Sequence, residues 1–113
     1  MSATTASDAA FGAVEVVLTG ELDIATMDQA QERIEAAEAG SPPLLVIDFS
    51  RLEFVDSSGV RLALLADDRA RAAGRRVAVR LGKGHALRAF QALGLVDKLD
   101  IVPDDASVDG ASG

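Results

Sequence analysis

Strand-like and helix-like segments alternate along this chain, and the alternation restricts its fold more than any other feature of the sequence. Apolar spacing predicts helices that begin near residues 24 or 27, 58 and 85, and strands over residues 14–19, 44–49, 76–81 and 98–102. Segments that alternate in this way form a mostly parallel sheet with right-handed crossovers. We therefore expect a single α/β domain whose mostly parallel sheet has four to five strands, together with about three to four helices.

Two details of the pattern refine this expectation. The run 44–49 is almost continuously apolar, which is typical of a central strand that is covered on both faces. At the start of the first helix, Thr26 and Gln29 have the spacing of a capping box. We also expect an apolar stripe on this helix to face the core, and its members are Ile24, Met27, Ala30, Ile34 and Ala37.

The two ends of the chain differ in composition from its middle. Residues 1–10 are small and polar, so we expect either a flexible N-terminus or an edge strand there. Residues 104–113 are acidic and small and offer little to bury, which predicts a disordered tail. The folded domain is expected over 11–103.

Length and charge exclude several classes of function. The chain has 113 residues and a net charge of −7, which fits one domain and disfavours nonspecific binding to nucleic acid or to an anionic membrane. No run approaches the roughly 18 apolar residues that span a bilayer. The first residues lack the basic and apolar parts of a secretory signal, and cysteine is absent. We expect a cytoplasmic protein that contacts neither nucleic acid nor membrane directly.

The sequence also lacks the residues that most kinds of enzyme active site require. His85 is the single histidine, and no G-x-S-x-G elbow accompanies it. The loop 82–84 is no phosphate loop, since a Walker A motif would need glycine at Val77 and serine or threonine at Gly84. No carboxylate and histidine spacing suggests a metal site. We expect no catalytic residue, no metal and no cofactor.

A short polar stretch, Asp56-Ser57-Ser58-Gly59, separates the apolar strand 44–49 from the helix that follows. Asp56 and both serines are residues that favour the N-cap of a helix, so they could serve only to satisfy free backbone N–H groups. A helix N-terminus also stabilises an anion, including a phosphate carried by a serine. The topology places Asp23 near these serines, because the turn 20–23 and the loop 50–57 follow two strands of one parallel sheet.

These motifs resemble the STAS domains of anti-sigma factor antagonists. The resemblance rests on Gly20-Glu21-Leu22-Asp23 before a helix, on Asp56-Ser57-Ser58-Gly59 after a buried strand, and on the later run from Gly84 to Leu95. It covers about residues 12–103. It implies a STAS-like fold and a protein that acts by exchanging partners.

The resemblance also implies roles for individual residues. The family's phosphoacceptor directly follows the aspartate, which selects Ser57, with Ser58 as the second choice. Asp23 and Asp56 match the acidic residues around that serine, and Glu21, Ser58 and Gly59 complete the expected partner-binding environment. The expected partners are an ATP-binding, GHKL-type anti-sigma factor kinase, which the unphosphorylated protein binds so that a sigma factor is released, and a serine phosphatase.

The sequence is also compatible with other functions. The domain could be an unphosphorylated STAS subunit of a lipid-transport ABC complex, although such domains usually carry a residue other than serine at the acceptor position. It could instead be a component of a stress-signalling scaffold. A small nucleotide-binding module is a further alternative, which a flat ATP titration without a kinase would remove.

Overall fold

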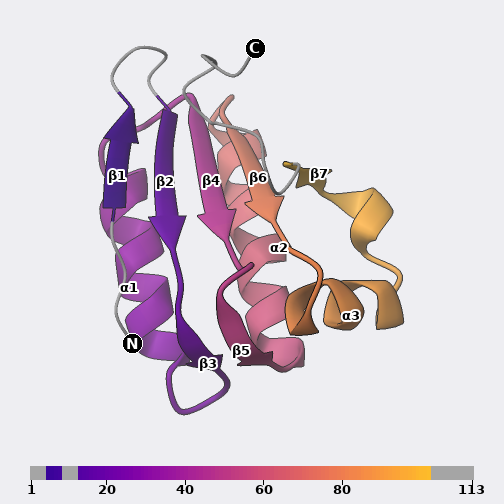
Figure 1. Cartoon of the computed structure of the whole chain (residues 1–113). Coiled ribbons are helices and arrows are strands. Elements are labelled where there is room, and N and C mark those ends of the chain that lie inside the picture. The colour runs from indigo at the N-terminus through magenta and orange to yellow at the C-terminus, as the bar shows by residue number, and fades with distance from the viewer. Residues whose placement is uncertain (1–4, 9–12, 103–113) are drawn as a thin grey trace.

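The protein is an α/β domain, seen in a computed structural model that describes residues 5–8 and 13–102. Its main sheet has the strand order β1-β2-β4-β6-β7 (Figure 1). These strands are β1 (Thr5–Asp8), β2 (Ala13–Val17), β4 (Leu44–Asp48), β6 (Arg76–Arg80) and β7 (Asp100–Ile101). β1 pairs with β2 in the antiparallel sense and all the other neighbours are parallel. The predicted mostly parallel sheet is confirmed. The predicted tail over 104–113 lies outside the described residues.

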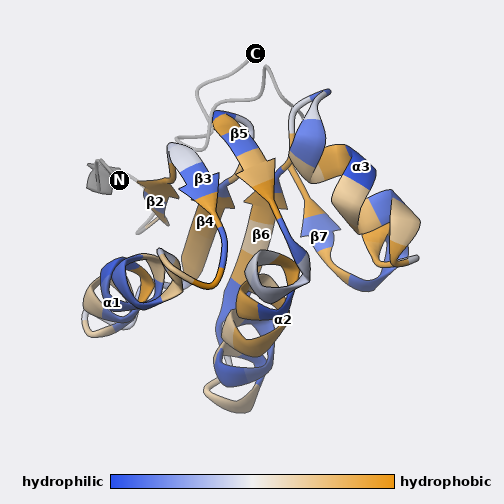
Figure 2. Ribbon diagram, turned by 90° about the horizontal axis from the view of Figure 1, so that it is seen from below, coloured by the Kyte–Doolittle hydropathy of each residue, from blue (hydrophilic) through white to orange (hydrophobic). Residues whose placement is uncertain are grey.

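In the described residues the sheet is accompanied by the helices α1 (Met27–Glu38), α2 (Ser57–Ala72) and α3 (His85–Ala92). α1 and α2 lie side by side on one face of the sheet, and α3 lies at its end against β5 (Leu52–Val55) (Figure 2). A short 3-10 helix, η1 (Val96–Lys98), leads into β7. For this reason the strand predicted over 98–102 is observed only at Asp100–Ile101.

The core lies between the sheet and α1 and α2. Residues 45–49 are all buried, so the central strand predicted from the apolar run is confirmed. The helices contribute many alanines to this core, and their small side chains let the helices approach the sheet closely. Where α3 meets the core, the rings of Phe49 and Phe90 pack edge to face with centroids 5.6 Å apart.

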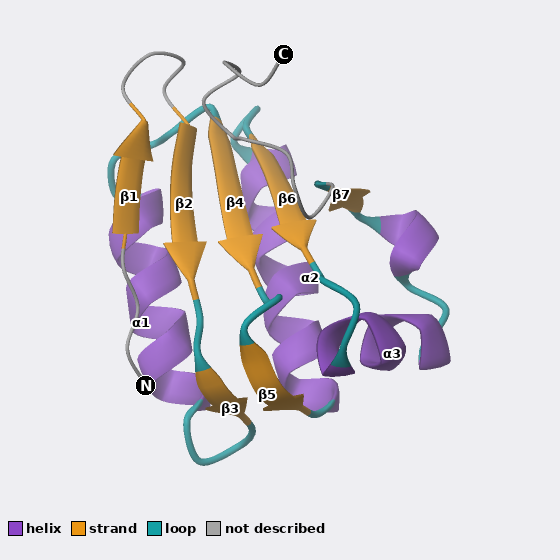
Figure 3. Ribbon diagram, viewed as in Figure 1, coloured by secondary structure: helices purple, strands orange, loops and turns teal. Residues whose placement is uncertain are grey.

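The turn predicted over 20–23 and the loop predicted over 50–57 each contain a short strand. β3 (Gly20–Leu22) and β5 pair in parallel beyond the carboxyl ends of β2 and β4 (Figure 3). Each has only three or four residues, too few for a recognisable alternation. We call this pair the small sheet. It forms the base on which the start of α2 is placed.

The predicted capping box of α1 is wrong. Thr26 occupies the N-cap position of α1 but makes no side-chain cap hydrogen bond. Its hydroxyl donates instead to the carbonyl oxygen of Glu21 at 2.8 Å. The hydroxyl finds this acceptor because the chain folds back from β3, a tertiary contact that the spacing to Gln29 does not reveal.

A buried arginine links three strands on the face of the sheet opposite α1 and α2. Arg80 Nε lies 3.2 Å from Glu15 Oε2 and 3.7 Å from Asp48 Oδ2, and all three side chains are largely buried. Asp48 Oδ1 also accepts hydrogen bonds from the backbone N–H and the hydroxyl of Ser50. One cation therefore compensates carboxylates from β2 and β4.

Candidate functional site

The start of α2 is capped by Asp56. The Asp56 carboxylate accepts hydrogen bonds from the backbone N–H groups of Ser58, at 2.9 Å, and Gly59, at 3.3 Å. Ser57 is the first residue of the helix and is exposed, whereas Ser58 is half-buried. Within the described part of the chain, the Ser57 hydroxyl makes no hydrogen bond. Of Asp56, Ser57 and Ser58, only Asp56 caps the helix with its side chain. The Ser57 hydroxyl is therefore not needed to cap α2.

The electrostatic environment at the start of α2 would stabilise an anionic group attached to Ser57. Free N–H groups and the positive end of the helix dipole stabilise negative charge in the first turn. No acidic residue occupies that turn in α2. A phosphate on Ser57 would therefore meet a favourable helix end, while Asp56 beside it keeps the cap.

Gly59 allows α2 to pack closely on the small sheet. A Cβ atom at this position would lie 2.5 Å from Val55 Cγ2 and 2.8 Å from Leu22 Cδ2, closer than real side chains approach. The residue is fully enclosed. Its role is thus to bring the first turn of α2, and Ser57 with it, down onto β3 and β5.

We expect Gly59→Ala to lower the free energy of unfolding by about 1–3 kcal/mol, since the added methyl overpacks the contact with Leu22 and Val55. Urea unfolding followed by circular dichroism measures this change. Gly40→Ala is the control, because a Cβ there would lie at an ordinary 3.8 Å from the Ala37 carbonyl oxygen and would overpack nothing. Equal stability of the two variants would contradict the close packing at Gly59.

The small sheet brings Asp23 beside Asp56. Leu22 is in register with Val55, and the Asp56 N–H donates to the Leu22 carbonyl oxygen at 3.2 Å. Asp23 and Asp56 directly follow these paired residues. By the alternation of a strand, Glu21 and Phe54 lie on the outward side of the small sheet, where both are exposed.

Hydrogen bonds fix the loop that follows β3. Asp23 Oδ1 accepts from the N–H groups of Ala25, at 2.9 Å, and Thr26, at 3.3 Å. The Thr26 hydroxyl accepts from the Asp23 N–H at 3.1 Å and donates to the Glu21 carbonyl oxygen. The Asp23 carboxylate is therefore engaged in shaping its own loop.

The prediction that Ile24 faces the core is wrong. α1 begins only at Met27, so Ile24 lies in the loop, where it is 82% exposed. Phe54 is also a large exposed apolar residue, at 46%. The sequence pattern did not indicate that either residue lies on the surface. The signal that could have indicated the exposure of Ile24 is its position between Asp23 and Thr26, two residues that favour turns and helix N-caps.

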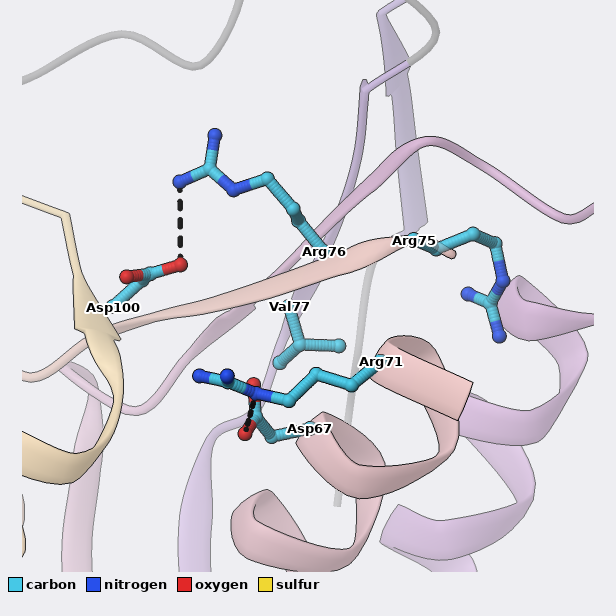
Figure 4. Close-up of a pocket in the computed structure, with 6 residues that line it drawn as sticks. All are labelled: Asp67, Arg71, Arg75, Arg76, Val77 and Asp100. Atoms are coloured by element: carbon cyan, nitrogen blue, oxygen red, sulfur yellow. Dashed lines mark hydrogen bonds and ion pairs between the residues drawn. The ribbon is translucent and has the colours of Figure 1, made fainter. Parts of the chain in front are cut away.

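A second charged region lies at the amino end of β6, away from Ser57. Arg71, Arg75 and Arg76 line a cavity of about 310 Å³ together with Asp67, Asp100 and Val77 (Figure 4). Arg71 Nε donates to Asp67 at 2.8 Å, which raises the pKa of Arg71 above its ordinary value, and Arg76 pairs with Asp100 at 3.2 Å. Arg75 extends away from both pairs. The Arg76–Asp100 pair joins β6 to β7, whereas the Arg71–Asp67 pair links two turns within α2.

Among residues 5–8 and 13–102, no group of three or more histidine, cysteine or carboxylate side chains is placed to hold a metal ion. None of the helices in that part of the chain has the length and apolar character needed to cross a membrane.

The mostly parallel sheet, the two helices on one of its faces and the small sheet at its end form the fold of a known domain family. The family model described as "Mlab, STAS domain" matches residues 5–103. The chain belongs to the STAS domain family. No curated protein matches it at a significant level.

Solved structures of anti-sigma factor antagonists match the fold over nearly the whole chain. SpoIIAA in its unphosphorylated form is 25% identical, with a TM-score of 0.74, and the match covers 96% of this chain and 90% of that chain. An anti-sigma factor antagonist from Mycobacterium paratuberculosis is 28% identical, with a TM-score of 0.73 and coverage of 96% and 89%. Phosphorylated SpoIIAA from Bacillus is 25% identical, with a TM-score of 0.68 and coverage of 96% and 94%. The resemblance seen in the sequence is confirmed at the level of fold and family.

Proposed function

We propose that this protein is a cytoplasmic anti-sigma factor antagonist that is controlled by phosphorylation of Ser57. In its unphosphorylated form it binds an anti-sigma factor that is also a GHKL-type serine kinase, and so releases a sigma factor. The kinase supplies Mg-ATP chemistry, a serine phosphatase removes the phosphate, and the antagonist itself catalyses nothing and holds no cofactor. The observation that carries this proposal is the exposed Ser57 hydroxyl at the start of α2, next to a cap already supplied by Asp56.

The charge around Ser57 explains how a phosphate would change partners. A phosphate adds about −1.5 to −2 charges, and it would stand close to Asp23 and Asp56 on a protein whose net charge is already −7. The end of α2 tolerates that charge. A partner surface packed flush against the hydroxyl does not, because the dianion would be buried without a counter-charge.

Burial favours Ser57 over Ser58 as the acceptor. Ser57 is exposed, whereas Ser58 is half-buried and its N–H is bound by the cap. A kinase needs access to the hydroxyl oxygen, and only the first serine presents it fully. The similar protein SpoIIAA has been solved in both an unphosphorylated and a phosphorylated form, which supports a phosphorylation cycle here.

The proposal is tested by incubating the purified protein with Mg-ATP and each purified GHKL-type anti-sigma factor kinase of its source organism. Intact mass and peptide mapping should find one phosphate, on Ser57, in the wild type and in Ser58→Ala, and none in Ser57→Ala. Phosphate on Ser58 would overturn the assignment. Binding of a kinase without any phosphate transfer would overturn the proposed control.

A second candidate is a STAS subunit that stays bound to one partner and is never phosphorylated. The description of the matching family model, "Mlab, STAS domain", favours it. In an affinity capture from native lysate, this candidate predicts that wild type, Ser57→Ala and Ser57→Asp retain the same partner. The first proposal predicts that a GHKL-type kinase is retained by the first two and lost by the third.

A further inference from the structure

We propose that Ile24 is an apolar anchor for the anti-sigma factor, and that Asp23 and Thr26 are positioning residues that hold it outward. This inference rests on the proposed function and names the part of the surface that recognises the partner. It assigns to Asp23 the shaping of a loop, in addition to the negative charge that Asp23 places near Ser57.

Hydrogen bonds among its own residues fix the conformation of the loop from Glu21 to Thr26. Asp23 Oδ1 binds two backbone N–H groups, and the Thr26 hydroxyl bridges the Asp23 N–H and the Glu21 carbonyl oxygen. The Thr26 N–H also donates to the Asp23 carbonyl oxygen at 3.1 Å. Such a loop loses little conformational freedom on binding, which favours affinity.

Ile24 is the most exposed large apolar residue of the described chain, at 82%. A side chain of this size gains free energy by leaving water, and anchors of this kind dominate the energy of many interfaces. The packing of the domain gives it no role, since it contributes nothing to the core. The same end of the molecule carries the exposed Phe54, three residues before Ser57.

Charge indicates what kind of surface Ile24 meets. Glu21 and Glu53 are exposed on the small sheet, and Asp23 and Asp56 follow its strands. An apolar centre with an acidic rim fits a partner that has an apolar pocket with basic residues around it. The pairing of Leu22 with Val55 places this loop at the same end of the molecule as Ser57, so we assign its occupant as the anti-sigma factor that phosphorylates this serine.

The positioning role of Asp23 can be separated from a role of its charge. Asp23→Asn keeps an oxygen acceptor for the N–H groups of Ala25 and Thr26 but removes the charge, while Asp23→Ala removes both. Thr26→Ser keeps the hydroxyl, and Thr26→Val removes it at nearly constant volume. Hydrogen exchange of the Ala25 and Thr26 amides should be about five to ten times faster in Asp23→Ala than in Asp23→Asn, the factor expected for one hydrogen bond.

The decisive experiment uses the kinase that phosphorylates the wild-type protein. Calorimetry without ATP measures the Kd of its complex with each variant. We expect Ile24→Ser to raise Kd about thirtyfold or more, the effect of an interface hot spot. Ile101→Ser, on the far edge strand, is the matched control and should leave Kd unchanged. Asp23→Ala and Thr26→Val should weaken binding, and Asp23→Asn and Thr26→Ser should restore it.

The outcomes separate this inference from the proposed function. If the wild type binds and is phosphorylated but Ile24→Ser binds equally well, the anchor is refuted and the proposed function stands. If Asp23→Asn binds as weakly as Asp23→Ala while its loop amides stay protected, the charge matters and the positioning role is refuted. If the wild type binds no such kinase, the proposed function itself fails, and the anchor with it.

Discussion

Ser57→Asp is expected to weaken binding of the anti-sigma factor kinase several-hundredfold, while Ser57→Ala binds like the wild type. The loss corresponds to about 3–4 kcal/mol of binding free energy. It arises because a carboxylate at this position is pressed into the interface without a counter-charge, beside Asp23 and Asp56. Calorimetric titration of the kinase with each purified variant measures the difference.

The matched control for this prediction is Ser57→Asn, which has nearly the same shape as the aspartate without its charge. It should bind much more tightly than Ser57→Asp. The fold provides a second control. Because the first turn of α2 contains no acidic residue, the aspartate should raise the stability of the free protein by about 0.3–1 kcal/mol through the helix dipole. Equal affinities of the Asn and Asp variants would show that size, and not charge, disturbs the interface.

Arg80→Met is expected to lower the free energy of unfolding by about 3–5 kcal/mol. The side chain is only 8% exposed and lies between the carboxylates of Glu15 and Asp48. Removing the guanidinium leaves both acids in a largely buried place without a cation, which costs more than the lost attraction alone. Urea unfolding at neutral pH measures the change.

Arg76→Met provides the comparison for Arg80. Arg76 pairs with Asp100 at 3.2 Å, but the two side chains are 67% and 50% exposed. Water and salt screen such a pair, so its loss should cost no more than about 1 kcal/mol. If Arg80→Met lowered the free energy of unfolding no more than Arg76→Met does, the buried Arg80 cluster would not contribute to stability as proposed.

The sequence predicted the main elements because each of them carries its own signal. The apolar run 44–49 identified the central strand, and the residues around Ser57 identified the start of α2. The small sheet could not be predicted, since three- and four-residue strands are defined by the partner beside them. The exposure of Ile24 was missed for a related reason. Its helical spacing to Met27 is real, but the Asp23 and Thr26 hydrogen bonds hold the chain out of the helix before residue 27.

The Arg80 cluster shows a different limit. Its hydrogen bond to Glu15 joins residues 65 positions apart, and no local pattern connects them. Each of these charged residues, read alone in its strand, predicts a solvated position. Only the register of β2, β4 and β6 makes them neighbours.

The cap that Asp56 supplies to α2 has a consequence for the timing of the proposed cycle. Since the helix does not depend on the Ser57 hydroxyl, adding or removing a phosphate there would require no refolding and no slow rearrangement of the domain. The active and inactive forms of such a protein would differ only in whether Ser57 carries a phosphate, which is the covalent mark. The lifetime of that state would then be set by how quickly the phosphatase reaches the mark, and the antagonist would be ready to act again as soon as the mark is removed.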